Sequence, residues 1–338
     1  MKAFVTGATG FIGSHLTGAL LDAGYDVACL TRSRSSTERL KPLNVELVRG
    51  DVQDVDSLKS AFRGADVVFH LAGLTSSLDN AAMYRVNAAG AGNVAAACAA
   101  QPNPPTLVAV SSLAAAGPAL EDRPRIETDP VYQTSEYGRS KRAGELAAAK
   151  FAAQAPISIA RPPIVFGEGD NNMLGMYRPI KWLGVSPTPW HIERRMSMIH
   201  AADLSDGLIA VAERGRRVSP DGLEADEQSN GVYFLAAEKQ PTYAEWGRLI
   251  AQSLGRRRFF SLRAPEFVLW GAAGLADAWA FIRRRRGIFN IDKVREATAG
   301  SWTCSGDRAR HELGFEVKAT LEDRFAETTR WYQRERWL

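Results

Sequence analysis

The sequence is short of cysteine and histidine, and neither residue occurs in a metal-binding pattern. Its three cysteines, Cys29, Cys98 and Cys304, are far apart and odd in number, so they indicate neither a disulfide framework nor a paired-cysteine metal site. The 5 histidines are scattered without ligand spacing, and we therefore expect no metal. Such cysteine usage is typical of a reducing compartment.

A strong excess of one charge and a long apolar run are also missing. The net charge is +4, from 42 Lys+Arg against 38 Asp+Glu, which is too small an excess to predict a nucleic-acid partner. No apolar run reaches the roughly 18 residues of a spanning helix. Residues 1–7 enter a strand pattern directly, without the features of a secretory signal. We therefore expect a soluble, cytoplasmic protein.

The first half of the chain alternates short apolar runs with helical patterns. The runs are continuous and rich in β-branched residues, as parallel strands covered on both faces are. They lie at 3–5, 27–30, 45–48, 67–69, 107–110 and 157–160, and helix-compatible segments lie at 13–23, 55–61, 87–100 and 140–153. This alternation predicts an α/β protein with a Rossmann-type doubly wound parallel sheet, whose ligands bind outside the carboxyl ends of the strands.

The second half is less regular, and 338 residues exceed a typical single domain. Residues 167–190 lack periodicity, which predicts a loop-rich region over a site. We expect a strand at 231–235 and a helix at 243–254 that Thr242 caps. The expected domains are a dinucleotide-binding domain at 1–166, joined by about 198–236, and a smaller C-terminal α/β substrate-binding domain from 167–197 and 237–338.

A glycine-rich turn follows the first expected strand and opens the first expected helix. Its glycines are three residues apart, which permits a tight turn, a close approach of a pyrophosphate and packing of helix on strand. The helix N-terminus offers free N–H groups to the phosphates. The alternative is a glycine-rich surface turn. The cofactor contacts predicted here are Gly7, Thr9, Gly10, Phe11, Ile12 and Gly13.

The end of the second expected strand predicts which dinucleotide is bound. A site that prefers NAD carries an acid about 20 residues beyond the glycines, whereas this chain reads Thr31-Arg32-Ser33-Arg34. Arg32 is suited to pair with a 2′-phosphate, so we expect NADP(H) as the preferred cofactor and NAD(H) as the alternative. These arginines are otherwise ordinary surface residues of a loop. Asp51, after the third strand, is either an adenine contact or an Asx turn or helix cap.

A serine, a tyrosine and a lysine follow in the order that carbonyl chemistry needs. Ser112 ends a buried strand, and Tyr137 and Lys141 are four residues apart, so on a helix they share one face. A phenol with a pKa of roughly 10 is a poor base at neutral pH, and a nearby ammonium favours the phenolate. Ser112 then holds the substrate oxygen. A tyrosine and a lysine at this spacing are often only an exposed pair on a helix surface. The catalytic interpretation depends on the order in which the glycine turn, the serine, and the tyrosine and lysine occur along the chain.

These motifs resemble those of the extended short-chain dehydrogenase/reductases, which include nucleotide-sugar epimerases and dehydratases, dihydroflavonol reductases and 3β-hydroxysteroid dehydrogenases. The resemblance runs nearly from end to end of the chain, and it is specific for family but not for substrate. It rests on TGATGFIG at 6–13, GDV at 50–52, HLAG at 70–73, Asn87, SS at 111–112, YGRSK at 137–141, RPPIVFG at 161–167 and MIHAADL at 198–204.

The resemblance implies further contacts. Besides Lys141, which would hold the nicotinamide ribose, the implied cofactor contacts are Asp51, Val52, Leu71, Ala72, Gly73, Asn87, Pro162, Ile164 and Val165. The implied substrate-facing residues are Thr75, Tyr84, Asn172 and His200. His200 has the alternative of a structural histidine. A homodimer is expected by analogy with the family.

The chain departs from the family's pattern at two places, and the first departure favours NADP(H) and net redox chemistry. Thr31 and Arg32 replace the acid that sugar epimerases carry, and Ala116-Gly117 stands where the family has Tyr-Gly. We therefore expect an NADP(H)-dependent oxidoreductase acting on a carbonyl or secondary alcohol of a small molecule. The alternatives are a nucleotide-sugar epimerase or dehydratase with tightly bound NAD, and a non-catalytic dinucleotide-binding or membrane-surface protein.

One apolar stretch stands outside these motifs. Residues 267–282 are apolar and aromatic and run into Arg283-Arg284-Arg285-Arg286. Such a helix either lies on an anionic membrane surface or packs on the core with its arginines at a favourable C-terminus. The near absence of a polar face favours packing on the core.

Overall fold

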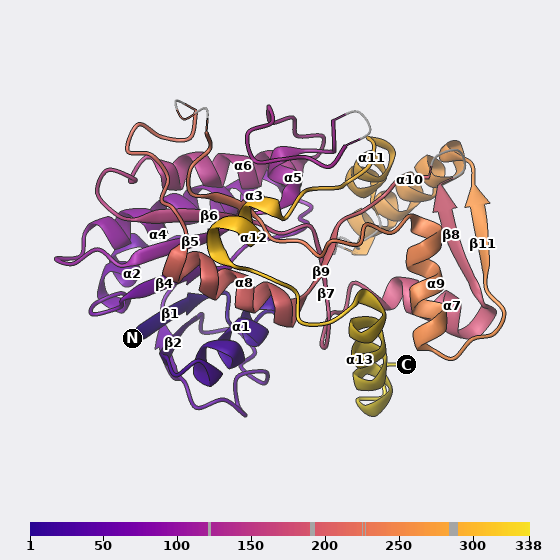
Figure 1. The fold of residues 1–338 in the computed structure, drawn as a ribbon, viewed down its shortest axis with the longest axis horizontal. Helices are drawn as coiled ribbons and strands as arrows, with labels where there is room; N and C mark the ends of the chain where they lie inside the picture. The colour runs from indigo at the N-terminus through magenta and orange to yellow at the C-terminus, as the bar shows by residue number, and fades with distance from the viewer. Residues whose placement is uncertain (121–122, 190–192, 225, 227, 284–289) are drawn as a thin grey trace.

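A seven-stranded parallel sheet forms the centre of the molecule (Figure 1). The computed structural model describes residues 1–120, 123–189, 193–224, 226, 228–283 and 290–338, without the side chains of 187, 189 and 281–283. The strand order is β10-β6-β5-β4-β1-β2-β3, which confirms the expected doubly wound fold. The strands are β1 (Lys2–Thr6), β2 (Asp26–Thr31), β3 (Glu46–Arg49), β4 (Val67–His70), β5 (Thr106–Val110), β6 (Ile157–Arg161) and β10 (Val232–Phe234).

Helices cover both faces of this sheet, because alternate residues of each strand point to opposite sides. In β1, Ala3 and Val5 join the core beneath α1 (Phe11–Asp22), α8 (Ala201–Arg214) and α12 (Asp307–Leu313). Phe4 joins the other core, beneath α2 (Val55–Ala61), α4 (Gly90–Ala99) and α6 (Glu136–Ala149). The two helix layers lie on opposite sides of the sheet in Figure 1. Apolar side chains are buried on both faces, as the continuous apolar strands require.

Two helices begin earlier than their sequence patterns indicate. The helix expected from residue 87 is the end of a longer run of α3 (Asn80–Tyr84), a π-helical turn η1 (Arg85–Ala89) and α4. The helix expected from residue 140 begins at Glu136, because Ser135 caps it by accepting the N–H of Gly138. Tyr137 therefore lies in the first turn of α6. A short helix, α5 (Leu113–Ala116), follows β5.

The remaining elements gather at one end of the sheet. The prediction that residues 167–190 are loop-rich is wrong: they include α7 (Leu174–Leu183) and β8 (Val185–Pro189), and Pro179 inside α7 disguises its pattern. Thr242 caps α9 (Tyr243–Ser253) as expected, in a capping box with Glu245. The other elements are β7 (Ile164–Phe166), β9 (Met198–His200), β11 (Phe260–Ala264), α10 (Glu266–Arg283), α11 (Ile291–Thr298) and α13 (Leu321–Arg334).

Helix α10 does not bury its apolar residues as the packed interpretation expects. Phe267 and Leu275 are each 76% exposed and Trp279 is 54% exposed, while Ala273 and Ala280 are buried. Arg284, Arg285 and Arg286, on which the membrane alternative also relied, lie outside the described residues. Among the helices described, none combines the length and apolar character needed to cross a membrane.

Candidate active site

The glycine turn is tightly packed at the carboxyl end of β1. Gly7 has a φ of +76°, and a Cβ there would lie 2.6 Å from the backbone nitrogen of Ala72. A Cβ on Gly13 would lie 2.2 Å from the carbonyl oxygen of Gly7. Gly10 caps α1 without a side-chain hydrogen bond to the first helical N–H groups. Those groups fit a pyrophosphate.

The basic residue expected to select the cofactor is available for a ligand. Arg32 follows the last residue of β2 and is exposed, as are Ser33 and Arg34. Within the described part of the chain, the guanidinium of Arg32 makes no hydrogen bond or ion pair, and its neighbours Thr31, Ser33 and Arg34 carry no carboxylate. This arrangement fits a phosphate on the adenosine ribose.

Asp51 and Val52 lie at the carboxyl end of β3. Asp51 accepts the backbone N–H of Gln53 at 3.0 Å, which is the Asx turn considered as the alternative. Val52 is buried, and its carbonyl accepts a hydrogen bond from Asn93 at 3.0 Å. These hydrogen bonds fix the backbone at residues 51–53. The second carboxylate oxygen of Asp51 is not used by the Asx turn and could contact a cofactor.

The segment after β4 connects the glycine turn to α6. His70 Nδ1 and Thr6 Oγ1 lie 2.7 Å apart, and burial together with the charge of Lys141 lowers the pKa of His70 to about 3. Asn87 accepts the N–H of Leu74 at 2.7 Å and donates to Ser140 Oγ at 2.9 Å. A buried amide in the π-helical turn therefore fixes the segment that carries Leu71, Ala72 and Gly73.

Helix α6 is anchored close against the sheet. A Cβ on Gly138 would lie 2.4 Å from the carbonyl oxygen of Ala114, so only glycine permits this approach. One turn from its C-terminal end, Glu145 forms a buried two-point ion pair with Arg161 at 2.7 and 2.8 Å. Paired, hydrogen-bonded charges of this kind are costly to break singly. They hold the helix that carries Tyr137 and Lys141.

The structure brings Ser112 and Tyr137 together. Ser112 follows β5 and caps α5, the short helix against which Gly138 in the first turn of α6 packs. Burial raises the pKa of Tyr137, while Lys293 and Ser112 act to lower it. Both groups stand at the carboxyl edge of the sheet, where doubly wound folds bind ligands.

Lys141 lies one helical turn beyond Tyr137. Its Nζ donates to the carbonyl oxygen of Val110 at 2.7 Å. A Cβ on Gly73 would lie 3.7 Å from the same Nζ, so the ammonium borders the segment after β4. Burial lowers the pKa of Lys141 to about 8. The charges acting on Tyr137 come instead from Lys293 and Glu296, which differs from the expected direct effect of Lys141.

Helix α11 contributes a residue that the sequence pattern did not single out. The Lys293 ammonium lies 5.3 Å from the ring centre of Tyr137, and Glu296 holds it at 2.6 Å. Asp292 accepts the N–H groups of Glu136 and Tyr137 at 3.2 and 3.4 Å. Helix α11 is thus fastened to the N-terminus of α6. No local signal marks this contact, because more than 150 residues separate its partners.

The other expected contacts lie in several places. Pro162 is buried, and its carbonyl accepts the N–H of Leu113 at 2.8 Å. Ile164 and Val165 lie in β7, which pairs with β9. Tyr84 donates to Glu136 at 3.4 Å, beside the start of α6. Thr75 and Asn172 are exposed.

His200 is held on both ring nitrogens. Its Nδ1 accepts the N–H of Ala202 at 3.3 Å, so Nε2 carries the proton that faces Glu168 at 3.2 Å. Burial raises the pKa of Glu168, but His200 outweighs it and the pKa falls to about 2. Glu327 brings a third ligand-type group within 4.8 Å. Because neither nitrogen of His200 offers a lone pair to the cluster, the geometry is that of a hydrogen bond from the imidazole to a carboxylate rather than a metal site.

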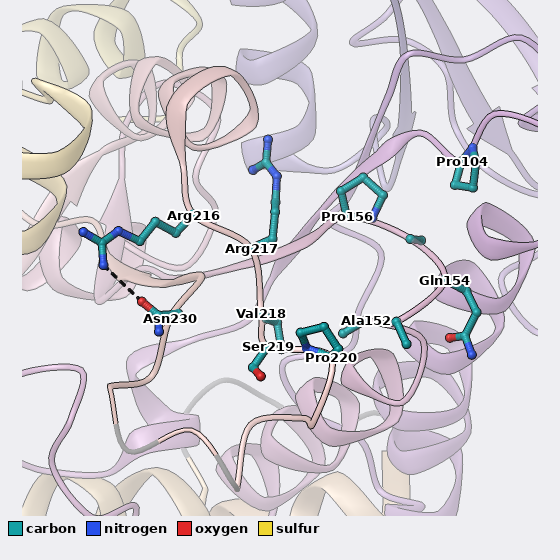
Figure 2. Close-up of a pocket in the computed structure, with 12 residues that line it drawn as sticks. Pro104, Ala152, Gln154, Pro156, Arg216, Arg217, Val218, Ser219, Pro220 and Asn230 are labelled. Atoms are coloured by element: carbon teal, nitrogen blue, oxygen red, sulfur yellow. Dashed lines mark hydrogen bonds between the residues drawn. The ribbon is translucent and has the colours of Figure 1, made fainter.

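A surface hollow of about 690 Å³ lies elsewhere (Figure 2). Its lining includes Pro156, Arg216 and Asn230, the last two joined by a 3.2 Å hydrogen bond. Pro156 precedes β6, so the hollow lies at the amino ends of the strands. It is therefore separate from Ser112 and Tyr137 at the opposite edge.

Comparison with known proteins gives consistent results. Residues 3–223 match the family described as "NAD dependent epimerase/dehydratase family". The chain is 33% identical to a ceramide reductase of Caulobacter vibrioides over 99% of this chain and 95% of the relative. It is 29% identical to a 4-hydroxy-2-methyl-3-oxo-4-farnesyl-3,4-dihydroquinoline-1-oxide ketoreductase of Stigmatella aurantiaca over 95% and 93%. A UDP-glucose 4-epimerase structure from Thermotoga maritima shares the fold, with a TM-score of 0.76, 19% identity and 99% of each chain covered.

Proposed function

The chain belongs to the NAD-dependent epimerase/dehydratase family, whose members include NAD(P)-dependent oxidoreductases, and we propose that it is an NADP(H)-dependent reductase of a ketone or aldehyde on a lipophilic small molecule. The observation that carries the proposal is the meeting of Ser112 and Tyr137 at the carboxyl edge of the sheet. That edge also carries the glycine turn.

The preference for NADP(H) is supported by the end of β2. Arg32 is exposed at the strand end, and Thr31 occupies the position of an acid. A guanidinium pairs with a phosphate through two charge-assisted hydrogen bonds, whereas an unpaired carboxylate there would repel it. The residues that would hold the rest of the cofactor are the glycine turn, the segment after β4 and Lys141.

The protein's own groups have distinct tasks in the reaction. A bound nicotinamide supplies or accepts the hydride. Ser112 donates a hydrogen bond that orients the substrate oxygen, and Tyr137 gives its phenolic proton to that oxygen in reduction, or takes it in oxidation. Lys141, charged below about pH 8, borders the segment that would meet the nicotinamide ribose.

The lipophilic substrate class is supported by the relatives. One is named for ceramide and another for a farnesyl-bearing quinoline, and both names describe reduction. Both relatives align over nearly the whole chain, so the similarity includes the C-terminal residues outside the central sheet. Helix α10 also presents apolar side chains beside α11, which adjoins Tyr137.

A spectrophotometric assay tests the proposal. NADPH oxidation is followed with ketones that carry long acyl or prenyl chains, for the wild type and for Tyr137→Phe. We expect turnover with such ketones and a loss of at least about 100-fold in Tyr137→Phe. Protein purified with retained NAD that interconverts a nucleotide sugar without net redox change would instead establish the epimerase alternative.

A further inference from the structure

The outward face of α10 is apolar, which reverses the usual orientation of a surface helix. Phe267, Leu275 and Trp279 are exposed at 76%, 76% and 54%. Between them, Gly271, Ala272 and Ala278 are also exposed, so one stripe of the helix faces outward. From Phe267 to Ala280 this stripe carries no charged side chain.

Further apolar side chains are exposed on β11 and α7. In β11, Phe260 and Leu262 are 63% and 55% exposed. Phe260 donates its N–H to the carbonyl of Gly184 at 2.8 Å, which brings the end of α7 and its exposed Trp182 to the same edge. These elements lie together at one end of the molecule in Figure 1. We call Trp182, Phe260, Leu262, Phe267, Leu275 and Trp279 the apolar end surface.

Basic residues border this surface. Arg257, Arg258 and Arg263 are exposed around β11, and the Lys181 ammonium lies 4.9 Å from the ring centre of Trp182. Residues 256–283 contain five arginines and two acids. The two acids are engaged elsewhere: Glu266 lies 3.8 Å from Arg194, and Asp277 accepts the N–H of Ile291.

We propose that the apolar end surface docks on a lipid bilayer that contains anionic lipids. Tryptophan and arginine are the side chains that suit the boundary between headgroups and acyl chains, and basic residues around an apolar face attract anionic headgroups. A second copy of the chain fits less well, because a symmetric contact would bring the same arginines face to face.

Helix α10, which carries part of the docked surface, packs against the helix that borders Tyr137. Asp277 of α10 accepts the N–H of Ile291 at 3.0 Å, which ties α10 to the start of α11. Two residues later, Lys293 lies against the ring of Tyr137. We therefore infer that a lipid leaving the bilayer enters the site past α10 and α11. This consequence rests on the proposed function, whereas the docking itself does not.

Co-sedimentation with vesicles tests the proposal in the absence of substrate. Vesicles of phosphatidylcholine alone are compared with vesicles that also contain phosphatidylglycerol. We expect the wild type to bind the anionic vesicles, and the variant Phe267→Ser/Leu275→Ser/Trp279→Ser to bind at least about ten-fold more weakly. In Arg257→Gln/Arg263→Gln the affinity for anionic vesicles should fall roughly five-fold per arginine. Added salt should lower the affinity of the wild type in the same way.

Matched controls separate a specific loss from a general one. Leu47→Ser and Arg63→Gln change exposed residues on β3 and beside α2, and both should bind vesicles as the wild type does. NADPH titration shows that each variant retains its fold, and its failure in the wild type would count against the proposed function alone. The docking proposal is overturned if the wild-type protein does not co-sediment with anionic vesicles. It is also overturned by a triple variant that converts a dimer to a monomer without affecting vesicle binding.

Discussion

The ammonium of Lys293 lies over the ring of Tyr137, 5.3 Å from the ring centre. A cation over an aromatic face is attracted by the ring, and more strongly when the phenol ionises. Glu296 fixes this ammonium at 2.6 Å and also accepts a hydrogen bond from Ser135 at 2.5 Å. The cap of α6 and the charge beside Tyr137 are therefore parts of one arrangement.

Replacing Lys293 should weaken the ionisation of Tyr137. In Lys293→Met the pKa of Tyr137 rises, because burial then acts with less opposition. We expect alcohol oxidation, which needs the phenolate, to fall roughly 2- to 30-fold at pH 7 and to recover at higher pH. Ultraviolet tyrosinate titration, with Tyr137→Phe subtracted, measures the shift directly. Lys181→Met removes another lysine from an aromatic ring and should leave the titration unchanged; an unshifted titration in Lys293→Met would contradict the prediction.

His70 should make the fold sensitive to acid. Its pKa is about 3 in the folded protein because burial excludes the charged form, whereas in the unfolded chain it is roughly 6.5. Its contribution to stability is fully present above pH 6.5 and is lost as the pH falls toward 3, because only the unfolded chain then takes up the proton. Between pH 7.5 and 5.5 the loss is about 1.4 kcal/mol.

Urea unfolding at the two pH values measures this contribution. The drop in the free energy of unfolding should shrink by that amount in His70→Gln. It should persist in His311→Gln, which changes an exposed histidine. An equal drop in both variants would show that other groups cause it.

At the scale of elements, the tightest requirement lies where β1 meets α1. In Gly7→Ala the new Cβ would meet the backbone at Ala72 and the φ of +76° would be strained. We expect dinucleotide affinity to fall at least about 100-fold. Gly18→Ala, also in this unit but with no atom within 4 Å of its Cβ, should bind normally and raise stability by about 0.5–1 kcal/mol. Calorimetric titration with the dinucleotide measures both affinities. Normal binding by Gly7→Ala would contradict the assignment of the glycine turn as the phosphate-binding site.

Elements with a strong local signal could be predicted from the sequence. The six apolar runs are strands of the sheet, and the Thr242 cap is present. Helix α7 was not predicted, because Pro179 interrupts its helical pattern. The exposure of the apolar face of α10 was not predicted either, because the sequence pattern of an apolar helix is the same whether that face is buried or exposed. Local patterns describe which segments form, and packing decides which way they face.

At the scale of the whole molecule, the site is assembled from distant parts of the chain. The sheet places the glycine turn, Arg32 and Ser112 at one edge, as the order of motifs indicates. Lys293 arrives from α11, and no sequence pattern predicts so long-range a contact. The division into a dinucleotide-binding domain and a substrate-binding domain, the homodimer and the cytoplasmic location stay predictions.

The preference for NADP(H) is the central claim, and titration calorimetry of NADPH and NADH tests it most directly. The wild type should bind NADPH more tightly, and Arg32→Asp should lose about 10- to 100-fold in NADPH affinity while NADH binding is kept or improved, because the lost contact is a charge-assisted hydrogen bond. Equal affinities for both cofactors, or an Arg32→Asp variant that binds NADPH as the wild type does, would contradict the account.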